Sequence, residues 1–204
     1  MQAQFPRINA ILKSRRDSMD DAIVERMLLG YAFVDDLLAR KVDLFSLAQL
    51  RCYLELNAIV LCGIDPKIRA ESARHLAATE KHFYDEKDGG IRDIIEWYDM
   101  HAKESAWKRA AGVYIRVLSE PELFIEGNHR TGALIMSYIL ASEGHPPFVL
   151  TVDNAKAYFD PSTLITKKKK KSLTLLLEMP RLKRQFADFL KFQENPKYLQ
   201  RPRA

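Results

Sequence analysis

A chain of 204 residues, 47% of them hydrophobic, is long enough to bury one sizeable core and suits one domain or one domain with a helical appendage. Its formal net charge of +5 equals the charge of the lysine run at 167–171, so the remainder is close to neutral. This balance excludes a fold that acts as a nucleic-acid platform over its whole surface.

The spacing of the two cysteines and the lengths of the apolar runs indicate in which cellular compartment the protein is expected. Cys52 and Cys62 lie in one apolar segment with a helical pattern, and a rise of ~1.5 Å per residue separates them by roughly 15 Å. That is too far for a disulfide, so reduced thiols and a reducing compartment are expected. The start of the chain carries no long apolar signal region, and no apolar run reaches the ~20 residues of a membrane span. We therefore expect a soluble, cytoplasmic protein with no membrane partner.

Hydrophobic spacing predicts helices along most of the chain, and strand signals are scarce. The polar stretch DEKDGG at 85–90 is expected to be a loop or a short β-hairpin. The fold class predicted is all-α, a compact bundle around a central buried helix. In chain order the expected helices are 20–40, 43–63, 65–84, 91–104, 106–120, about 131–142, a short one from about Asp153, and 173–193 with a break at Pro180.

The segment ALIMSYIL, 133–140, is apolar on nearly every face, which predicts the buried centre of the bundle. Directly before it, EGNHRTG places polar and flexible residues where this helix begins. The first turn of a helix exposes unpaired N–H groups and the positive end of its dipole, which makes an anion pocket. A plain turn with Arg130 paired to Glu126 or Glu122 remains the alternative.

Each residue type in this loop suits phosphate chemistry. Gly127 and Gly132 let the backbone turn and approach a ligand closely, and the Asn128 amide can donate a hydrogen bond. Arg130 offers a planar fork for phosphate oxygens. Glu126 can hold Mg²⁺ beside them. The pattern is not a Walker A loop, because no G-x-x-x-x-G-K-[ST] occurs.

The wider segment 110–160 resembles the core of the Fic family, whose loop reads H-x-F-x-D/E-G-N-G-R-x-x-R. The resemblance implies one Fic-like domain over 1–204, with a core at about 43–165, N-terminal helices in 1–42 and a C-terminal helical extension in 166–204. The positions that carry it are Phe124, Glu126, Gly127, Asn128, Arg130, Thr131 and Gly132 in the loop, GHPP at 144–147, and then Asn154 and Tyr158.

The resemblance also implies a function. Fic proteins bind the phosphates of ATP or another nucleotide with magnesium, and they usually transfer AMP to a hydroxyl of a target protein. Carried over to this chain, Glu126 would hold the metal and Phe124 would anchor the loop from below. The cofactor-binding residues would be Gly127, Asn128, His129, Arg130, Thr131 and Gly132.

Three departures fall at positions close to the chemistry. Glu122 occupies the place of the family's histidine general base, and a glutamate, with a reference pKa of ~4.3, is a weak base. His129 replaces the third loop glycine, and Ala133 replaces the final arginine. Standard AMP transfer is therefore expected to be absent or altered.

Two candidates for a catalytic group follow, Glu122 and His129. A histidine at a helix N-terminus tends to stay neutral near pH 7, which suits a base, but His129 can equally be a capping or core residue. Two functions stay open: a Fic-type nucleotidyltransferase with an altered base, and a non-catalytic Fic-fold regulatory or protein-interaction module. In either case the expected partners are a nucleotide and a target protein, and the loop at 85–90 is a candidate docking flap.

Overall fold

The structure is a computed structural model that describes residues 3, 5–12, 19–85, 90–166 and 173–199. The described residues form α-helices joined by turns, with no β-strand among them, which confirms the all-α prediction. The helices are α1 (Phe5–Ile11), α2 (Asp21–Ala39), α3 (Leu50–Cys62), α4 (Pro66–Glu71), α5 (Ala73–Phe83), α6 (Ile91–Met100), α7 (Ala106–Leu118), α8 (Asn128–Ser142), α9 (Val152–Ile165) and α10 (Leu173–Phe192), with 3-10 turns at Leu47–Gln49 and Pro196–Tyr198.

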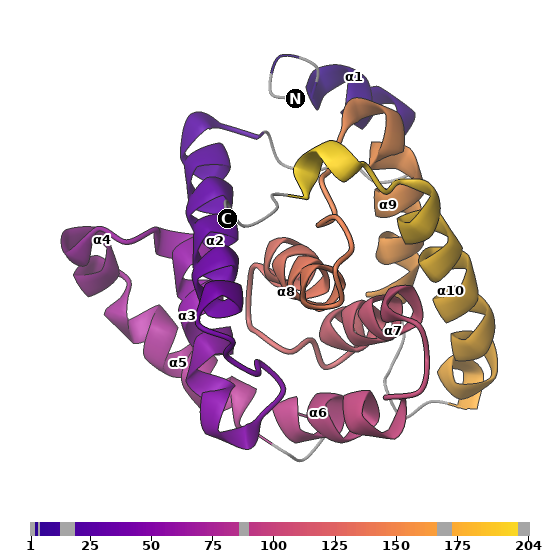
Figure 1. Ribbon diagram of the computed structural model, residues 1–204. Coiled ribbons are helices and arrows are strands. Elements are labelled where there is room, and N and C mark those ends of the chain that lie inside the picture. The colour runs from indigo at the N-terminus through magenta and orange to yellow at the C-terminus, as the bar shows by residue number, and fades with distance from the viewer. Residues whose placement is uncertain (1–2, 4, 13–18, 86–89, 167–172, 200–204) are drawn as a thin grey trace.

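Helix α8 is the centre of the bundle, as the apolar segment predicted. Every residue from Thr131 to Leu140 is buried, whichever face of the helix it lies on. Figure 1 shows α8 nearly end-on, with α2 and α3 on one side and α7, α9 and α10 on the other. Because α8 is packed on all sides, its position in the bundle is fixed by the surrounding helices.

A glycine in α7 allows a tryptophan of α6 to pack closely against that helix. Gly112 of α7 faces the indole ring of Trp97 on α6, and a Cβ atom at Gly112 would lie far inside van der Waals contact with that ring. Trp97 is itself only 5% exposed, and its ring centroid lies 5.2 Å from the guanidinium carbon of Arg116 and 5.3 Å from the ammonium nitrogen of Lys183. The α6–α7 contact therefore depends on the missing side chain at Gly112.

The second predicted helix begins later than its pattern suggested. The expected start at Asp43 is wrong, because a turn and a 3-10 turn at Leu47–Gln49 precede α3. The Asp43 carboxylate accepts from the backbone N–H of Phe45, and the backbone N–H of Leu44 donates to the hydroxyl of Tyr138 at 3.1 Å. These contacts pull the buried Leu44 and Phe45 into the core and hold the chain out of helical geometry.

The third predicted helix, 65–84, is divided into α4 and α5 at Ser72. Arg69 explains the direction of α4, since its guanidinium donates to both carboxylate oxygens of Glu55 at 2.8 and 3.0 Å and to the carbonyl of Gly63 at 2.8 Å. A bidentate arginine contact of this kind fixes geometry as well as adding energy. Helix α4 is thereby tied to the end of α3, while α5 runs on in another direction (Figure 1).

The C-terminal helix is continuous over Leu173–Phe192, so the break predicted at Pro180 is wrong. A proline removes one backbone hydrogen bond, and tertiary packing can offset that loss. Here Phe186, Ala187 and Leu190 are buried, and the Phe186 ring stacks on Tyr114 of α7 at 5.1 Å. The helix expected from about Asp153 is also longer than predicted, because α9 extends through Pro161 to Ile165.

Some expectations fall on parts of the chain outside the described residues. The predicted loop or hairpin at 85–90 is one, because 86–89 are not described, and the lysine run at 167–171 is another. Within the described part of the chain, no helix combines the length and the apolar character needed to cross a bilayer.

Replacing Gly112 by Ala tests the α6–α7 contact. We expect Gly112→Ala to lower the free energy of unfolding by about 1–3 kcal/mol, because the new methyl group overpacks against the Trp97 ring. Urea unfolding measures the change. In a Trp97→Leu background the same substitution should cost clearly less, and equal costs in both backgrounds would contradict this packing.

Candidate functional site

The loop between α7 and α8 is anchored by one aromatic side chain. Phe124 is 1% exposed and stacks on Phe83, at the end of α5, with ring centroids 5.6 Å apart and planes 14° from parallel. This burial removes a large apolar surface from water and fixes the loop against α5. The role is the packing role expected for Phe124 from the sequence.

Helix α8 is preceded by a residue in the left-handed conformation. Gly127 has φ +79° and ψ 8°, a backbone conformation that residues other than glycine rarely adopt. A Cβ atom there would also lie 3.0 Å from the amide nitrogen of Asn57 and 3.2 Å from a methyl group of Leu61. Both constraints demand glycine at 127, and they bring the loop backbone close to α3.

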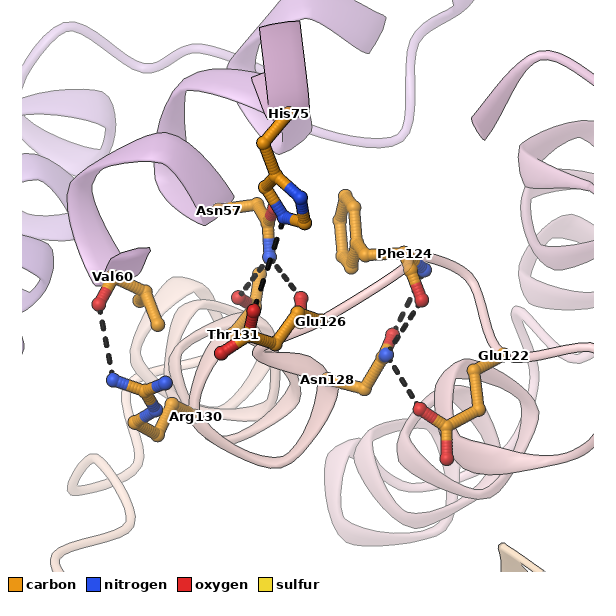
Figure 2. A network of polar contacts seen from close by, with 9 residues as sticks. All are labelled: Asn57, Val60, His75, Glu122, Phe124, Glu126, Asn128, Arg130 and Thr131. Atoms are coloured by element: carbon orange, nitrogen blue, oxygen red, sulfur yellow. Dashed lines mark hydrogen bonds and ion pairs between the residues drawn. The ribbon is translucent and has the colours of Figure 1, made fainter. Parts of the chain in front are cut away.

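The Asn128 side chain joins the start of α8 to the preceding part of the loop. Its Oδ1 accepts from the backbone N–H of Phe124 at 2.9 Å, and its Nδ2 donates to the carbonyl of Phe124 at 2.7 Å and to Oε2 of Glu122 at 2.6 Å (Figure 2). The side chain is 3% exposed. Both amide hydrogens are thus committed inside the loop, so in this arrangement Asn128 shapes the turn, whereas the sequence suggested a donor to phosphate.

A second asparagine, Asn57 of α3, holds the other side of the turn. Its Nδ2 donates to the carbonyl of Glu126 at 2.9 Å and to the hydroxyl oxygen of Thr131 at 3.0 Å (Figure 2). No sequence motif pointed to Asn57. The available signal was an amide within the apolar run of α3, since a buried polar side chain requires partners elsewhere in the fold.

Arg130 reaches from α8 to the last turn of α3, where its guanidinium donates to the carbonyl of Val60 at 3.1 Å. Carbonyls in the last turn of a helix lack partners within it and carry the negative end of the dipole, so a cation is stabilised there. Arg130 therefore links the two helices whose ends form the site.

His129 turns its imidazole toward α7. Nδ1 lies 3.1 Å from the hydroxyl of Tyr114, and the backbone carbonyl of His129 accepts from the hydroxyl of Tyr158 at 3.1 Å. Gly132, one turn further, packs against the Tyr114 ring, where a Cβ atom would lie 2.9 Å from a ring carbon. In this structure the absence of a side chain at Gly132 thus serves the approach of α7 to α8.

The two carboxylates of the loop lie in different surroundings. The Glu126 side chain is 63% exposed, and its Oε2 is 3.9 Å from Nε2 of His75 on α5. Glu122 is half-buried, its carboxylate accepts from Asn128, and its carbonyl lies 2.8 Å from Nε2 of His82. Glu126 is therefore the carboxylate that projects toward solvent, while Glu122 is part of the hydrogen-bonded frame.

The structure thus brings the sequence-predicted residues together in one turn at the mouth of α8, against the end of α3. Within the described part of the chain, no group of three or more histidine, cysteine, aspartate and glutamate side chains is arranged to hold a metal ion. Comparison of the chain with protein-family models, with curated proteins and with solved structures gave no match.

Exchanging the Asn128 amide for a carboxylate tests the loop frame. Asn128→Asp keeps the acceptor for Phe124 N–H but sets a carboxylate against the Phe124 carbonyl and the Glu122 carboxylate. We expect a loss of about 2–4 kcal/mol in the free energy of unfolding near pH 7, measured with urea.

The matched rescue is Glu122→Gln in the Asn128→Asp background. A glutamine at 122 can donate to the new carboxylate, so part of the lost stability should return. If Asn128→Asp unfolds at the wild-type urea concentration, the frame described for this loop is incorrect.

Proposed function

We propose that this chain is a Fic-fold protein that binds a nucleotide or another phosphate ligand, with Mg²⁺, at the turn Glu126–Gly132, and in which standard AMP transfer is absent or altered. The observation that carries the proposal is a turn held rigidly at the start of a buried helix with one carboxylate projecting outward. Asn57, Phe124 and Asn128 hold the turn, and Glu126 is the projecting carboxylate.

Rigidity favours ligand binding here because a turn that is already ordered loses little entropy when a ligand arrives. The first-turn peptides of α8 supply N–H groups and the positive dipole end. Arg130 adds positive charge beside them. An anion at this position would meet a site whose geometry is set by the core of the protein.

The residues present fit a divalent ion in one respect. Glu126 is exposed and belongs to the same turn, so its carboxylate would share a Mg²⁺ ion with phosphate oxygens. When bound, the ion would neutralise charge between the carboxylate and the phosphates. Cofactor-binding contributions from Gly127 and His129 would come through the backbone, because the side chain is absent at 127 and faces α7 at 129. The Thr131 N–H is already donated to the Gly127 carbonyl at 2.9 Å, and Gly132 packs against Tyr114, so these two residues would hold the turn.

The surroundings of Glu122 support altered transfer. Its carboxylate accepts a hydrogen bond from the buried Asn128 amide at 2.6 Å, so one of its oxygens is committed to holding the loop. Ala133, in place of the family's final arginine, is 7% exposed. An arginine at this position would have to displace packed side chains. The fold therefore has no room for the arginine that binds phosphate in the Fic loop pattern.

A second function, a non-catalytic regulatory or protein-interaction module, is favoured by one observation. The Asn128 amide and the Arg130 guanidinium both donate to protein oxygens, so the turn is supported without any ligand. A fold that keeps this turn as structure alone would bind its target protein through its surface and would ignore nucleotides.

Thermal-shift measurements with a non-hydrolysable ATP analogue, with and without Mg²⁺, distinguish the two functions. A ligand present at a hundred times its dissociation constant should add ~2.7 kcal/mol to stability. We expect a Mg²⁺-dependent rise in Tm for wild type and its loss in Glu126→Gln, which removes the charge but keeps the shape.

Glu96→Gln is the matched control, since Glu96 is an exposed glutamate on α6. It should shift as wild type does. If Tm does not change with any nucleotide, the nucleotide-binding proposal is wrong and the protein-interaction function is favoured. Self-modification of wild type by labelled ATP would show that transfer is altered in mechanism and still present.

A further inference from the structure

The carbonyl oxygen of the Asn57 side chain is an unusual group. Its partner atom Nδ2 donates to two acceptors, Glu126 O and Thr131 Oγ1, so the orientation of the amide is fixed by those contacts. Oδ1 then remains buried with no hydrogen-bond partner among the described residues, on a side chain only 1% exposed. Buried oxygens of this kind are rare, and each one calls for a donor or a cation.

A second such atom belongs to His75, which contacts the same Glu126 residue. Nε2 of His75 is buried and without a hydrogen-bond donor or acceptor among the described residues. Its ring comes from α5 and faces the Glu126 carboxylate (Figure 2), and the carbonyl of the same Glu126 accepts from Nδ2 of Asn57 at 2.9 Å. One helical turn along α5, the hydroxyl of Thr79 is also buried and unpartnered, on a side chain 2% exposed.

The chemistry of these atoms points to a cation. Asn57 Oδ1 and the Glu126 carboxylate can only offer lone pairs, and a neutral imidazole offers one at Nε2. Nε2 of His75 and Oε2 of Glu126 are 3.9 Å apart. Two ligands bonded at ~2.1 Å to one ion lie roughly 3.0 Å apart at a right angle and roughly 4.2 Å apart when opposite, so the observed spacing falls within the range that one ion spans.

We propose that His75, Asn57 and Glu126 form a binding site for a first-row transition-metal ion such as Mn²⁺ or Zn²⁺. The proposal rests on the proposed function in taking Glu126 as the metal-binding acid of the loop. His75 Nε2, Asn57 Oδ1 and Glu126 Oε2 are the protein ligands, and solvent or phosphate oxygens complete the coordination. No third histidine, cysteine or acid joins His75 and Glu126 within the described part of the chain, so the site would be an open one.

The imidazole decides the class of ion. Imidazole nitrogen suits Zn²⁺, Fe²⁺, Ni²⁺ and Cu²⁺, whereas Mg²⁺ prefers an all-oxygen shell and retains its water molecules, and Mn²⁺ serves as the paramagnetic probe of the site. This site therefore favours a transition metal over the Mg²⁺ expected from the resemblance. Because Asn57 also holds the carbonyl of Glu126 and the hydroxyl of Thr131, a bound ion would stiffen the turn through the same side chain.

The test uses the 204-residue chain and Mn²⁺ alone, with no nucleotide present. Free Mn²⁺ is followed by electron paramagnetic resonance during a titration, and pulsed measurements on the bound ion detect coupling to a nitrogen ligand. We expect one bound Mn²⁺ with nitrogen coupling. His75→Gln should abolish the coupling and weaken Mn²⁺ binding by about tenfold or more. Loss of a residue that only hydrogen-bonds to a metal ligand already lowers metal affinity by about tenfold, so loss of a ligand should cost at least as much.

Two further variants make the result specific. Glu126→Gln should weaken Mn²⁺ binding while keeping the nitrogen coupling of any ion still bound. His101→Gln changes a histidine at the end of α6 whose Nδ1 faces the Trp97 carbonyl, and it should leave both the affinity and the coupling unchanged. A Mg²⁺ competitor should displace Mn²⁺ only at much higher concentration.

Absence of nitrogen coupling in wild type, or equal Mn²⁺ affinity in His75→Gln and wild type, overturns the site. The contact between His75 and Glu126 is then a plain ion pair, and the Asn57 oxygen is hydrated. This outcome is independent of nucleotide binding, because the thermal-shift result can be positive or negative whichever way the Mn²⁺ titration falls.

Discussion

Two buried asparagines fix the point where the central helix begins, and the rest of the site depends on that point. Asn128 ties the start of α8 back to Phe124 and Glu122, and Asn57 ties the same turn across to α3. Buried amides with satisfied donors are costly to disturb, so this frame holds the loop in one geometry. The left-handed Gly127 then directs the chain into the helix, and the Glu126 side chain projects outward.

The frame also explains why the loop tolerates its unusual residues. His129 does not crowd the turn, because its ring turns to Tyr114. Glu122 is not an isolated acid in the loop, because its carboxylate accepts a hydrogen bond from the Asn128 amide. Residues that look like losses when set against the Fic loop pattern have structural partners in this chain. These partners account for the residues at 122 and 129 in terms of the fold alone.

The sequence predicted the elements that its own spacing determines. Apolar residues on every face of 133–140 predicted a buried central helix, and Gly127 before it predicted a tight turn; both are confirmed. The contacts that set the chemistry came from distant segments. The hydrophobic periodicity of a segment does not predict the hydrogen bond from Asn57 to Glu126 or the contact between His75 and Glu126, because these residues are far apart in the sequence. Pro180 failed as a break for the same reason, since packing of Phe186 on Tyr114 overrides a local preference.

The central claim is that the peptides opening α8 bind an anionic group. Amide NMR shifts of Gly127 to Thr131, followed while a nucleotide and a divalent metal ion are added, test it most directly. The account predicts that these five amides, with those of Asn57 and His75, move together along one saturable binding curve. Large shifts confined to other surfaces, or no shifts at all when ligand is in excess, would contradict it.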